Sequence, residues 1–195
     1  MLARKAYERS KDESWEASVS IMLSAMTLEC YVNELSHRVS NFQIHEPIEE
    51  LKNLGFLLEE YEKNKNSLQS KIELIHFCLS GEKADKGSRY FQDISMLIKL
   101  RNALVHRKPE STGDFGADPD AVYSLHPFTS FLVERGLIQR PSEKMSPVWS
   151  YTVSQPSVAA WAYNTVVEAI TTTVSMLPES TTKSIEEFTT KHEKI

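Results

Sequence analysis

The chain has 195 residues, of which 41% are hydrophobic and 25% are charged, and its formal net charge is −5. This composition is typical of a folded globular domain and excludes general disorder, and the length predicts a single domain over residues 1–195. Because the negative net charge of the chain weakly repels a polyanion, any nucleic-acid role must rest on a local basic patch.

The sequence has no segment with the features of a membrane anchor or a secretion signal. Residues 1–13 carry Arg4, Lys5, Arg9 and Lys11 but lack an apolar stretch, and no later run approaches the roughly 18 apolar residues of a membrane span. Cys30 and Cys78 lie in apolar helical stretches without CxxC or Cys/His metal spacing, so we interpret both as reduced core residues. We therefore expect a cytoplasmic protein with no membrane partner, no cofactor and no metal site.

A long first helix is predicted over residues 15–37. Met22 and Met26 widen its buried stripe, and Ser10 or Asp12 is the candidate N-cap. The stripe itself consists of apolar residues at helical spacing: Ile21, Ala25, Leu28, Val32 and Leu35.

A polar row borders this stripe. Glu29, Asn33 and His37 continue the line that Met22 and Met26 begin. The row is therefore the place to look for a partner to a charged residue that a neighbouring helix directs toward the core.

Two shorter helices are predicted next. Pro47 fits the first turn of a helix over residues 47–63, although Gly55 within it weakens that prediction. The following helix, residues 68–79, should stop at Gly81. Their apolar stripes are Ile48, Leu51, Leu54, Leu58 and Tyr61 in the first, and Leu68, Ile72, Ile75 and Leu79 in the second.

The fourth main helix begins around Ser88 and places an arginine, Arg101, in the middle of its apolar stripe. The stripe consists of Phe91, Ile94, Leu97, Ile98, Leu100, Leu104 and Val105. Because arginine is almost never fully buried without a partner, Arg101 requires a carboxylate, a phosphate or a second subunit.

His106 lies near the C-terminus of this helix, because Pro109 stops the helix soon afterwards. In a regular helix Arg101 and His106 point about 140° apart, whereas Asn102 and His106 share one side. The arginine and the histidine can converge only if the last turn loosens or a second subunit completes the site.

The region after this helix begins with a predicted loop, residues 108–126, which contains aspartates without calcium-loop spacing. A short helix follows over residues 127–136, with Phe128, Phe131 and Leu132 buried. Trp149, Tyr151 and Val153 alternate with polar residues, which predicts a brief strand or extended arm, paired with residues 137–139 in a small β-hairpin.

Helical spacing returns over residues 154–176, and the tail, residues 181–195, has little apolar content. We interpret Trp15, Trp149 and Trp161 as core anchors rather than base-stacking platforms. The fold class is therefore all-α, a bundle of four to five main helices with a small β-hairpin or extended insertion near residues 137–153.

The run from Leu100 to His106, with Arg101, Asn102 and then His106 after four residues, resembles the signature of the HEPN superfamily. The resemblance covers the helical layout of about residues 14–177. Residues 108–153 then read as an insertion.

Membership would imply a helical bundle that forms a homodimer, in which two arginines and two histidines face one shared cleft. In active members this cleft is the active site of a metal-independent endoribonuclease. Such an enzyme is often a toxin partnered by a protein antitoxin. There Arg101 and His106 would be catalytic, with Asn102, Glu29 and Asn33 in support. The residue types suit this chemistry, because histidine moves protons near neutral pH and arginine stabilises phosphoryl charge.

The basic residues Lys99, Arg107 and Lys108 surround the motif and are the candidate phosphate contacts for an RNA ligand. Two alternatives remain open. Arg101 can form a structural ion pair with Glu29, and His106 can serve as a helix-terminal cation. Other members of the superfamily are non-catalytic binding or scaffolding modules, some of them beside nucleotidyltransferases, so the fold alone does not decide activity.

Overall fold

The computed structural model describes residues 2–41, 49–106, 125–141 and 148–178. Within these residues the chain is helical and contains no β-strand, which confirms the predicted all-α bundle. The helices are α1 (Leu2–Ser10), α2 (Trp15–Asn41), α3 (Glu49–Lys63), α4 (Leu68–Ser80), α5 (Arg89–Val105), α6 (Pro127–Glu134), α7 (Trp149–Val153) and α8 (Pro156–Met176).

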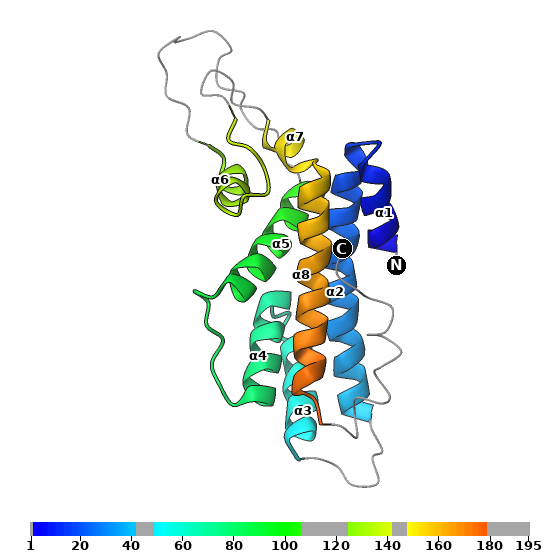
Figure 1. The fold of residues 1–195 in the computed structure, drawn as a ribbon. Coiled ribbons are helices and arrows are strands. Elements are labelled where there is room, and N and C mark those ends of the chain that lie inside the picture. The colour runs from blue at the N-terminus through cyan, green and yellow to red at the C-terminus, as the bar shows by residue number, and fades with distance from the viewer. Residues whose placement is uncertain (1, 42–48, 107–124, 142–147, 179–195) are drawn as a thin grey trace.

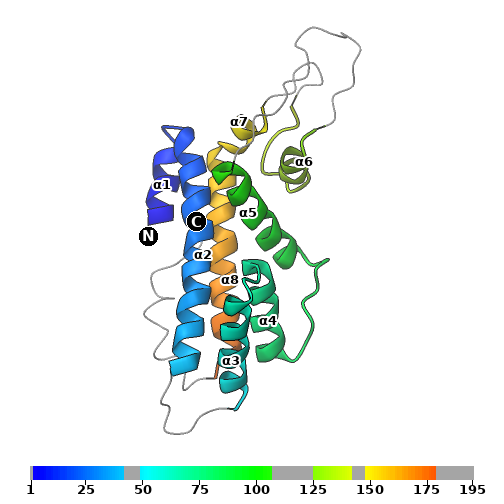
Figure 2. The ribbon, with the colours of Figure 1, turned by 180° about the vertical axis from the view of Figure 1, so that it is seen from behind.

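The two longest helices, α2 and α8, lie side by side and run in the same direction along the molecule (Figure 1). Helix α1 packs on one side of this pair, and α3 and α4 cover its lower end. Helix α5 crosses the other side obliquely, while α6 and α7 lie at the upper end, as the reverse view shows (Figure 2). None of these helices combines the length and the apolar character that crossing a bilayer requires.

The core forms where the apolar stripes of the five main helices meet. The predicted α2 stripe is fully covered: Ile21, Ala25, Leu28, Val32 and Leu35 are each at most 2% exposed. It packs with buried residues of the other helices, among them Leu54, Leu58, Ile94, Leu97, Leu100 and Ile170. Each such side chain contributes about 1.5–3 kcal/mol by leaving water.

The ends of α4 and α5 follow from local sequence. Ser67 and Ser88 are their N-caps, and each side-chain oxygen accepts a hydrogen bond from the backbone N–H three residues later. Helix α4 ends at Gly81, which adopts φ = 74° and donates its N–H to the Phe77 carbonyl. The predicted stop at Gly81 is therefore confirmed, because glycine takes this left-handed conformation without steric penalty.

Gly55 has a packing role that helix propensity does not reveal. A Cβ atom at this position would lie 3.0 Å from the Val39 carbonyl oxygen and 3.1 Å from the Ser40 nitrogen, both backbone atoms of α2. The missing side chain therefore lets α2 and α3 approach closely.

Helix α1 was not predicted from the sequence. It buries Ala3 and Ala6 against α2 and α8, and the Ser20 hydroxyl donates to the Ala3 carbonyl over 2.9 Å. The Arg9 guanidinium donates to both carboxylate oxygens of Glu16, at 2.8 and 3.0 Å. Ser10 does not cap the long helix as suggested, because it belongs to α1 and its hydroxyl donates to the Tyr7 carbonyl.

The predicted strand over residues 149–153 is wrong, because these residues form α7. Its buried residues are Trp149, Thr152 and Val153, whereas Tyr151 is 76% exposed. Burial thus follows the helical spacing i, i+3, i+4. The alternation of Trp149, Tyr151 and Val153 over five residues is too short to distinguish a strand from one turn of helix.

Three predicted core residues on α2 lie at the surface instead. Trp15 is 59% exposed, Met26 is 51% exposed, and Cys30 is exposed as a free thiol. Trp149 and Trp161 are buried as predicted. The long loop over residues 108–126 and the tail over 181–195 lie almost wholly outside the described residues.

Candidate functional site

Arg101 reaches from α5 to α2. Its Nη2 donates to Oε2 of Glu29, and its Nη1 donates to Oδ1 of Asn102 over 2.9 Å. The side chain of Arg101 is 26% exposed and that of Glu29 is 44% exposed. The polar row of α2 therefore supplies a carboxylate partner for the arginine, which is one of the alternatives that the sequence left open.

The position of Arg101 explains its partial exposure. Leu97 and Leu100, on the turn before it, are fully buried, whereas Val105, on the turn after it, is 54% exposed. Arg101 thus lies where α5 leaves the core, at the edge of the buried stripe rather than in its middle. Its guanidinium has two hydrogen-bonded partners and still contacts solvent.

His106 is the residue that ends α5. It has φ = −108° and ψ = 42°, and its backbone N–H donates to the Asn102 carbonyl over 2.9 Å. The last turn therefore keeps the regular helical hydrogen bond and has not loosened. Because Arg101 and His106 leave a regular helix in different directions, one chain brings Arg101, Asn102 and Glu29 together and leaves the His106 side chain exposed beside them.

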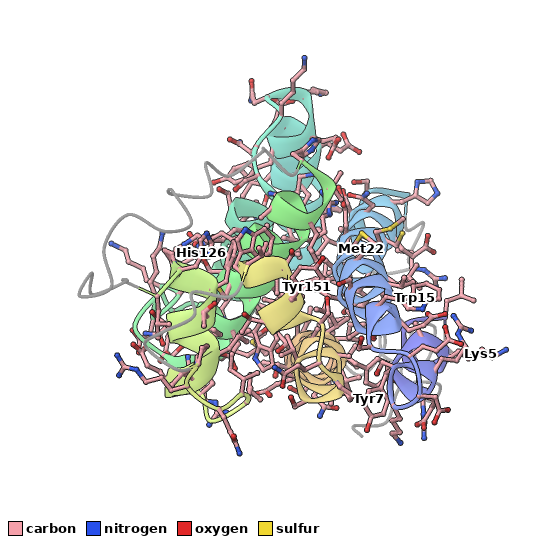
Figure 3. The ribbon with its side chains drawn as sticks, turned by 90° about the horizontal axis from the view of Figure 1, so that it is seen from above. Lys5, Tyr7, Trp15, Met22, His126 and Tyr151 are labelled. Carbon is pink, nitrogen blue, oxygen red and sulfur yellow. The ribbon has the colours of Figure 1, made fainter. Side chains whose placement is uncertain are left out.

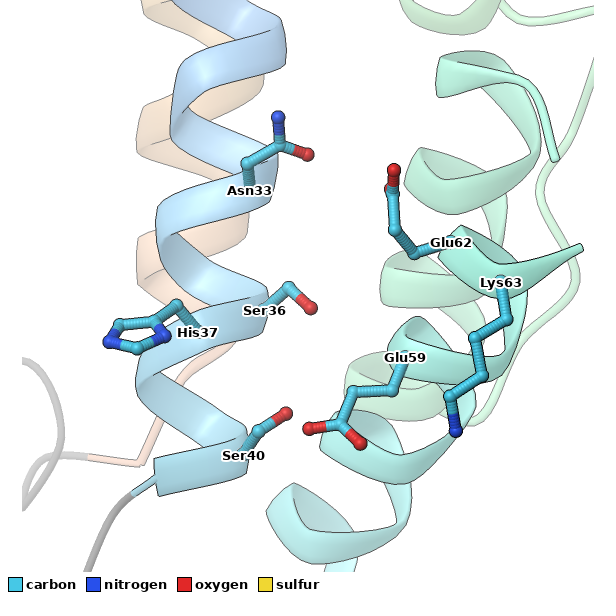
Figure 4. A pocket seen from close by; sticks show the side chains of 7 residues that line it. All are labelled: Asn33, Ser36, His37, Ser40, Glu59, Glu62 and Lys63. Carbon is cyan, nitrogen blue, oxygen red and sulfur yellow. The ribbon is translucent and has the colours of Figure 1, made fainter. Parts of the chain in front are cut away.

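Asn33 lies one turn beyond Glu29 and does not join this group. It lines a separate cleft of about 430 Å³ between α2 and α3, with Ser36, His37, Ser40, Glu59, Glu62 and Lys63 (Figure 4). Glu62 there also pairs with Lys71. Within one chain, therefore, Asn33 does not support Arg101.

The predicted phosphate contacts are placed only in part. Lys99 is exposed on α5. Arg107 and Lys108 lie outside the described residues.

Several apolar side chains of α2, α5 and α7 are exposed to solvent, a feature that sequence reasoning missed. We call the exposed Trp15, Met26 and Val105, together with Tyr151 of α7 and the half-buried Met22, the apolar face. Figure 3 views the molecule from the end that carries α7 and shows Trp15, Met22 and Tyr151 there. A hydrogen bond of 2.8 Å between the Ser18 and Ser154 hydroxyls joins α2 to the residue after α7.

The residues that α2 contributes to this face recur at helical spacing. Helical spacing alone does not show whether such residues face the protein's own core or the solvent. The spacing of Trp15, Met22 and Met26 is that of core residues. Only their position at the edge of the apolar stripe indicates that they are not fully buried. Single exposed apolar residues are normal, whereas exposed apolar side chains on three helices make the apolar face a candidate contact surface.

Comparison with family models, curated proteins and solved structures finds no match to this chain. In the parts of the chain that the structure describes, no group of three or more His, Cys, Asp or Glu side chains is arranged to hold a metal ion.

Proposed function

We propose that the chain is a HEPN-like, metal-independent endoribonuclease of toxin type that acts as a homodimer. The observation that carries this proposal is that the last turns of α5 carry a guanidinium, an amide and an imidazole, those of Arg101, Asn102 and His106, with Arg101 bonded to Asn102 and the His106 side chain exposed. The apolar face supplies surface for a second copy, whose His106 would complete the site.

Pairing with Glu29 leaves Arg101 able to bind phosphate. Of the five N–H donors of a guanidinium, Glu29 and Asn102 each engage one through the contacts described above. An ion pair between partly exposed side chains is worth only about 0–1 kcal/mol. A phosphate oxygen can therefore take the remaining donors, or displace Glu29, without a large loss of stability.

In the proposed reaction the 2′-hydroxyl of RNA attacks the adjacent phosphorus, and the bond to the 5′-oxygen of the next nucleotide breaks. One His106 accepts the 2′-hydroxyl proton and the other donates a proton to the leaving 5′-oxygen. Arg101 stabilises the charge that develops on the phosphoryl oxygens. The products are a 2′,3′-cyclic phosphate and a 5′-hydroxyl end.

Lys99, Arg107 and Lys108 would contact flanking phosphates in this proposal, and a protein antitoxin would act by covering the site. RNA is then the ligand, and the bulk negative charge of the chain makes binding depend on these local cations.

A second candidate function is a non-catalytic binding or scaffolding module, as partner of a nucleotidyltransferase for example. The Arg101–Glu29 ion pair favours it, because a carboxylate already neutralises the guanidinium in one chain. In this case Arg101 fixes the packing of α5 on α2.

The test is incubation of the purified protein with mixed RNA in EDTA, with detection of cyclic phosphate ends. We expect cleavage by the wild type and loss of at least 100-fold in rate for His106→Ala. His37→Ala, which removes an exposed histidine of α2, is the matched control and should cleave normally. Undiminished cleavage by His106→Ala would reject the site, and no cleavage by the folded wild type would favour the binding module.

A further inference from the structure

A second cleft, distinct from the end of α5, lies between α3, α4 and the turn that follows α4. It has a volume of about 460 Å³ and is lined by Tyr61, Ser70, Glu73, Phe77, Lys83 and Lys86, among others. Small-molecule sites typically have volumes of 300–1,000 Å³, so the cleft is large enough for one ligand of modest size.

An aromatic surface forms part of this cleft. Phe77 is 49% exposed although it lies on a helix whose Ile72 and Ile75 are buried. Tyr61, from α3, lines the same cleft. Exposed aromatic rings of this kind bind planar heteroaromatic groups by stacking, and every nucleobase has a face that can stack.

Among the side chains that line the cleft, two are cationic and one is anionic. Lys86 forms an ion pair of 3.0 Å with Glu73, whereas Lys83 is exposed and makes no ion pair with another described residue. Two ammonium groups against one carboxylate leave one cation for a ligand. The complementary ligand is therefore aromatic at one end and anionic at the other.

We propose that this cleft binds an unpaired nucleotide, with the base stacked on Phe77 and a phosphate held by Lys83. The combination of ring and phosphate is that of a nucleotide, either free or within single-stranded RNA. The proposal concerns binding only and does not depend on cleavage at Arg101.

The experiment measures binding of a fluorescently labelled single-stranded oligonucleotide by anisotropy. The probe has 2′-O-methyl riboses, so it lacks the attacking hydroxyl and cannot be cleaved by the proposed mechanism. Phe77→Ala should raise the Kd about tenfold, the range expected for one lost stacking contact. Phe77→Leu keeps an apolar side chain and should also weaken binding, which separates loss of the ring from loss of folding.

Two matched controls belong to the experiment. Phe56→Ala removes another phenylalanine, 64% exposed on α3, that does not line the cleft. Lys83→Glu tests the phosphate contact, and its control is Lys5→Glu, which makes the same charge change on α1. We expect both controls to bind like the wild type, and Lys83→Glu to bind more weakly with a salt dependence reduced by about one phosphate contact.

Competition with AMP identifies the source of the nucleotide. Displacement of the probe by AMP shows that a free nucleotide suffices, and retention of the probe shows that an RNA strand is required; either result, together with loss in Phe77→Ala, supports the proposal. An unchanged Kd in Phe77→Ala and Phe77→Leu would overturn it. So would Phe77-dependent binding of an acidic aromatic peptide in place of the oligonucleotide.

Discussion

At the scale of single residues, the pairing of Arg101 with Glu29 gives the arginine a structural role of limited size. A fully buried pair typically loses 3–5 kcal/mol when one partner is removed, but these side chains are 26% and 44% exposed. We therefore expect Arg101→Ala to lower the free energy of unfolding by about 1 kcal/mol, and His106→Ala to change it by less than about 0.5 kcal/mol.

A double-mutant cycle with Glu29→Gln and Arg101→Ala, followed by urea denaturation, isolates the pair. The coupling should be about 0.5–1 kcal/mol. Strictly additive single effects would show that the ion pair contributes nothing to stability.

A second prediction at this scale concerns alkaline pH. Burial raises the pKa of Tyr90 to about 12, and the negative charge of Glu168 acts in the same direction. Burial also raises the pKa of Tyr31. A tyrosine pKa that is higher in the folded state contributes stability below pH 10, the ordinary value, and that stability is lost as the pH rises toward 12.

The contribution of Tyr90 that disappears over this interval is about 2–3 kcal/mol. Urea denaturation at pH 9 and at pH 11.5 should therefore show a smaller loss of stability for Tyr90→Phe than for the wild type. An equal loss in both proteins would contradict the assignment to Tyr90.

At the scale of helices, Gly55 sets the distance between α2 and α3. Glycine in the middle of a helix is usually worse than alanine by about 0.5–1 kcal/mol, so helix propensity alone predicts that Gly55→Ala is stabilising. The added Cβ would meet backbone atoms of α2 at 3.0–3.1 Å, which cannot move as a flexible side chain can. Because overpacking costs typically 1–3 kcal/mol, we expect a net loss of about 1 kcal/mol.

Thermal melting compares this variant with Asn53→Ala, a substitution on the exposed side of the same helix. Asn53→Ala should leave the melting temperature nearly unchanged or raise it. A higher melting temperature for Gly55→Ala would show that α2 and α3 do not approach each other in this way.

The five main helices could be predicted because each carries an apolar stripe several turns long. The stripe from Ile21 to Leu35, for example, fits one period and is buried as a whole. The five residues of α7 are too few for the period to be recognised. Helix α1 buries mainly alanines, Ala3 and Ala6, whose small apolar area gives a weak periodic signal.

At the scale of the whole molecule, the homodimer is a prediction that association measurements can test. Sedimentation at micromolar concentration should report about twice the chain mass of 22.3 kDa. Met26→Arg and Val105→Arg place a charge on the apolar face and should each give a monomer. Phe56→Arg alters an equally exposed apolar residue on α3 and should leave the dimer intact. A wild-type monomer under these conditions would remove the basis for a composite site.

The pairing of Arg101 with Glu29 could be named from sequence as one alternative, because a charged residue in an apolar stripe requires a partner and the polar row of α2 offered one. The geometry of His106 could not be predicted in the same way. Whether a helix-terminal histidine meets another group depends on the last turn of α5 and on a second copy, and neither follows from residue spacing.

The two cysteines differ in exposure, so one of them can be labelled chemically without the other. Cys30 is exposed on α2 beside Glu29, whereas Cys78 is half-buried on α4 and burial raises the pKa of its thiol. Because the thiolate is the reactive form, a maleimide at neutral pH should modify Cys30 well before Cys78, which peptide mass mapping of a short time course can check. A single dye or spin label then attaches to the native sequence, next to the ion pair, and reports on what approaches that surface.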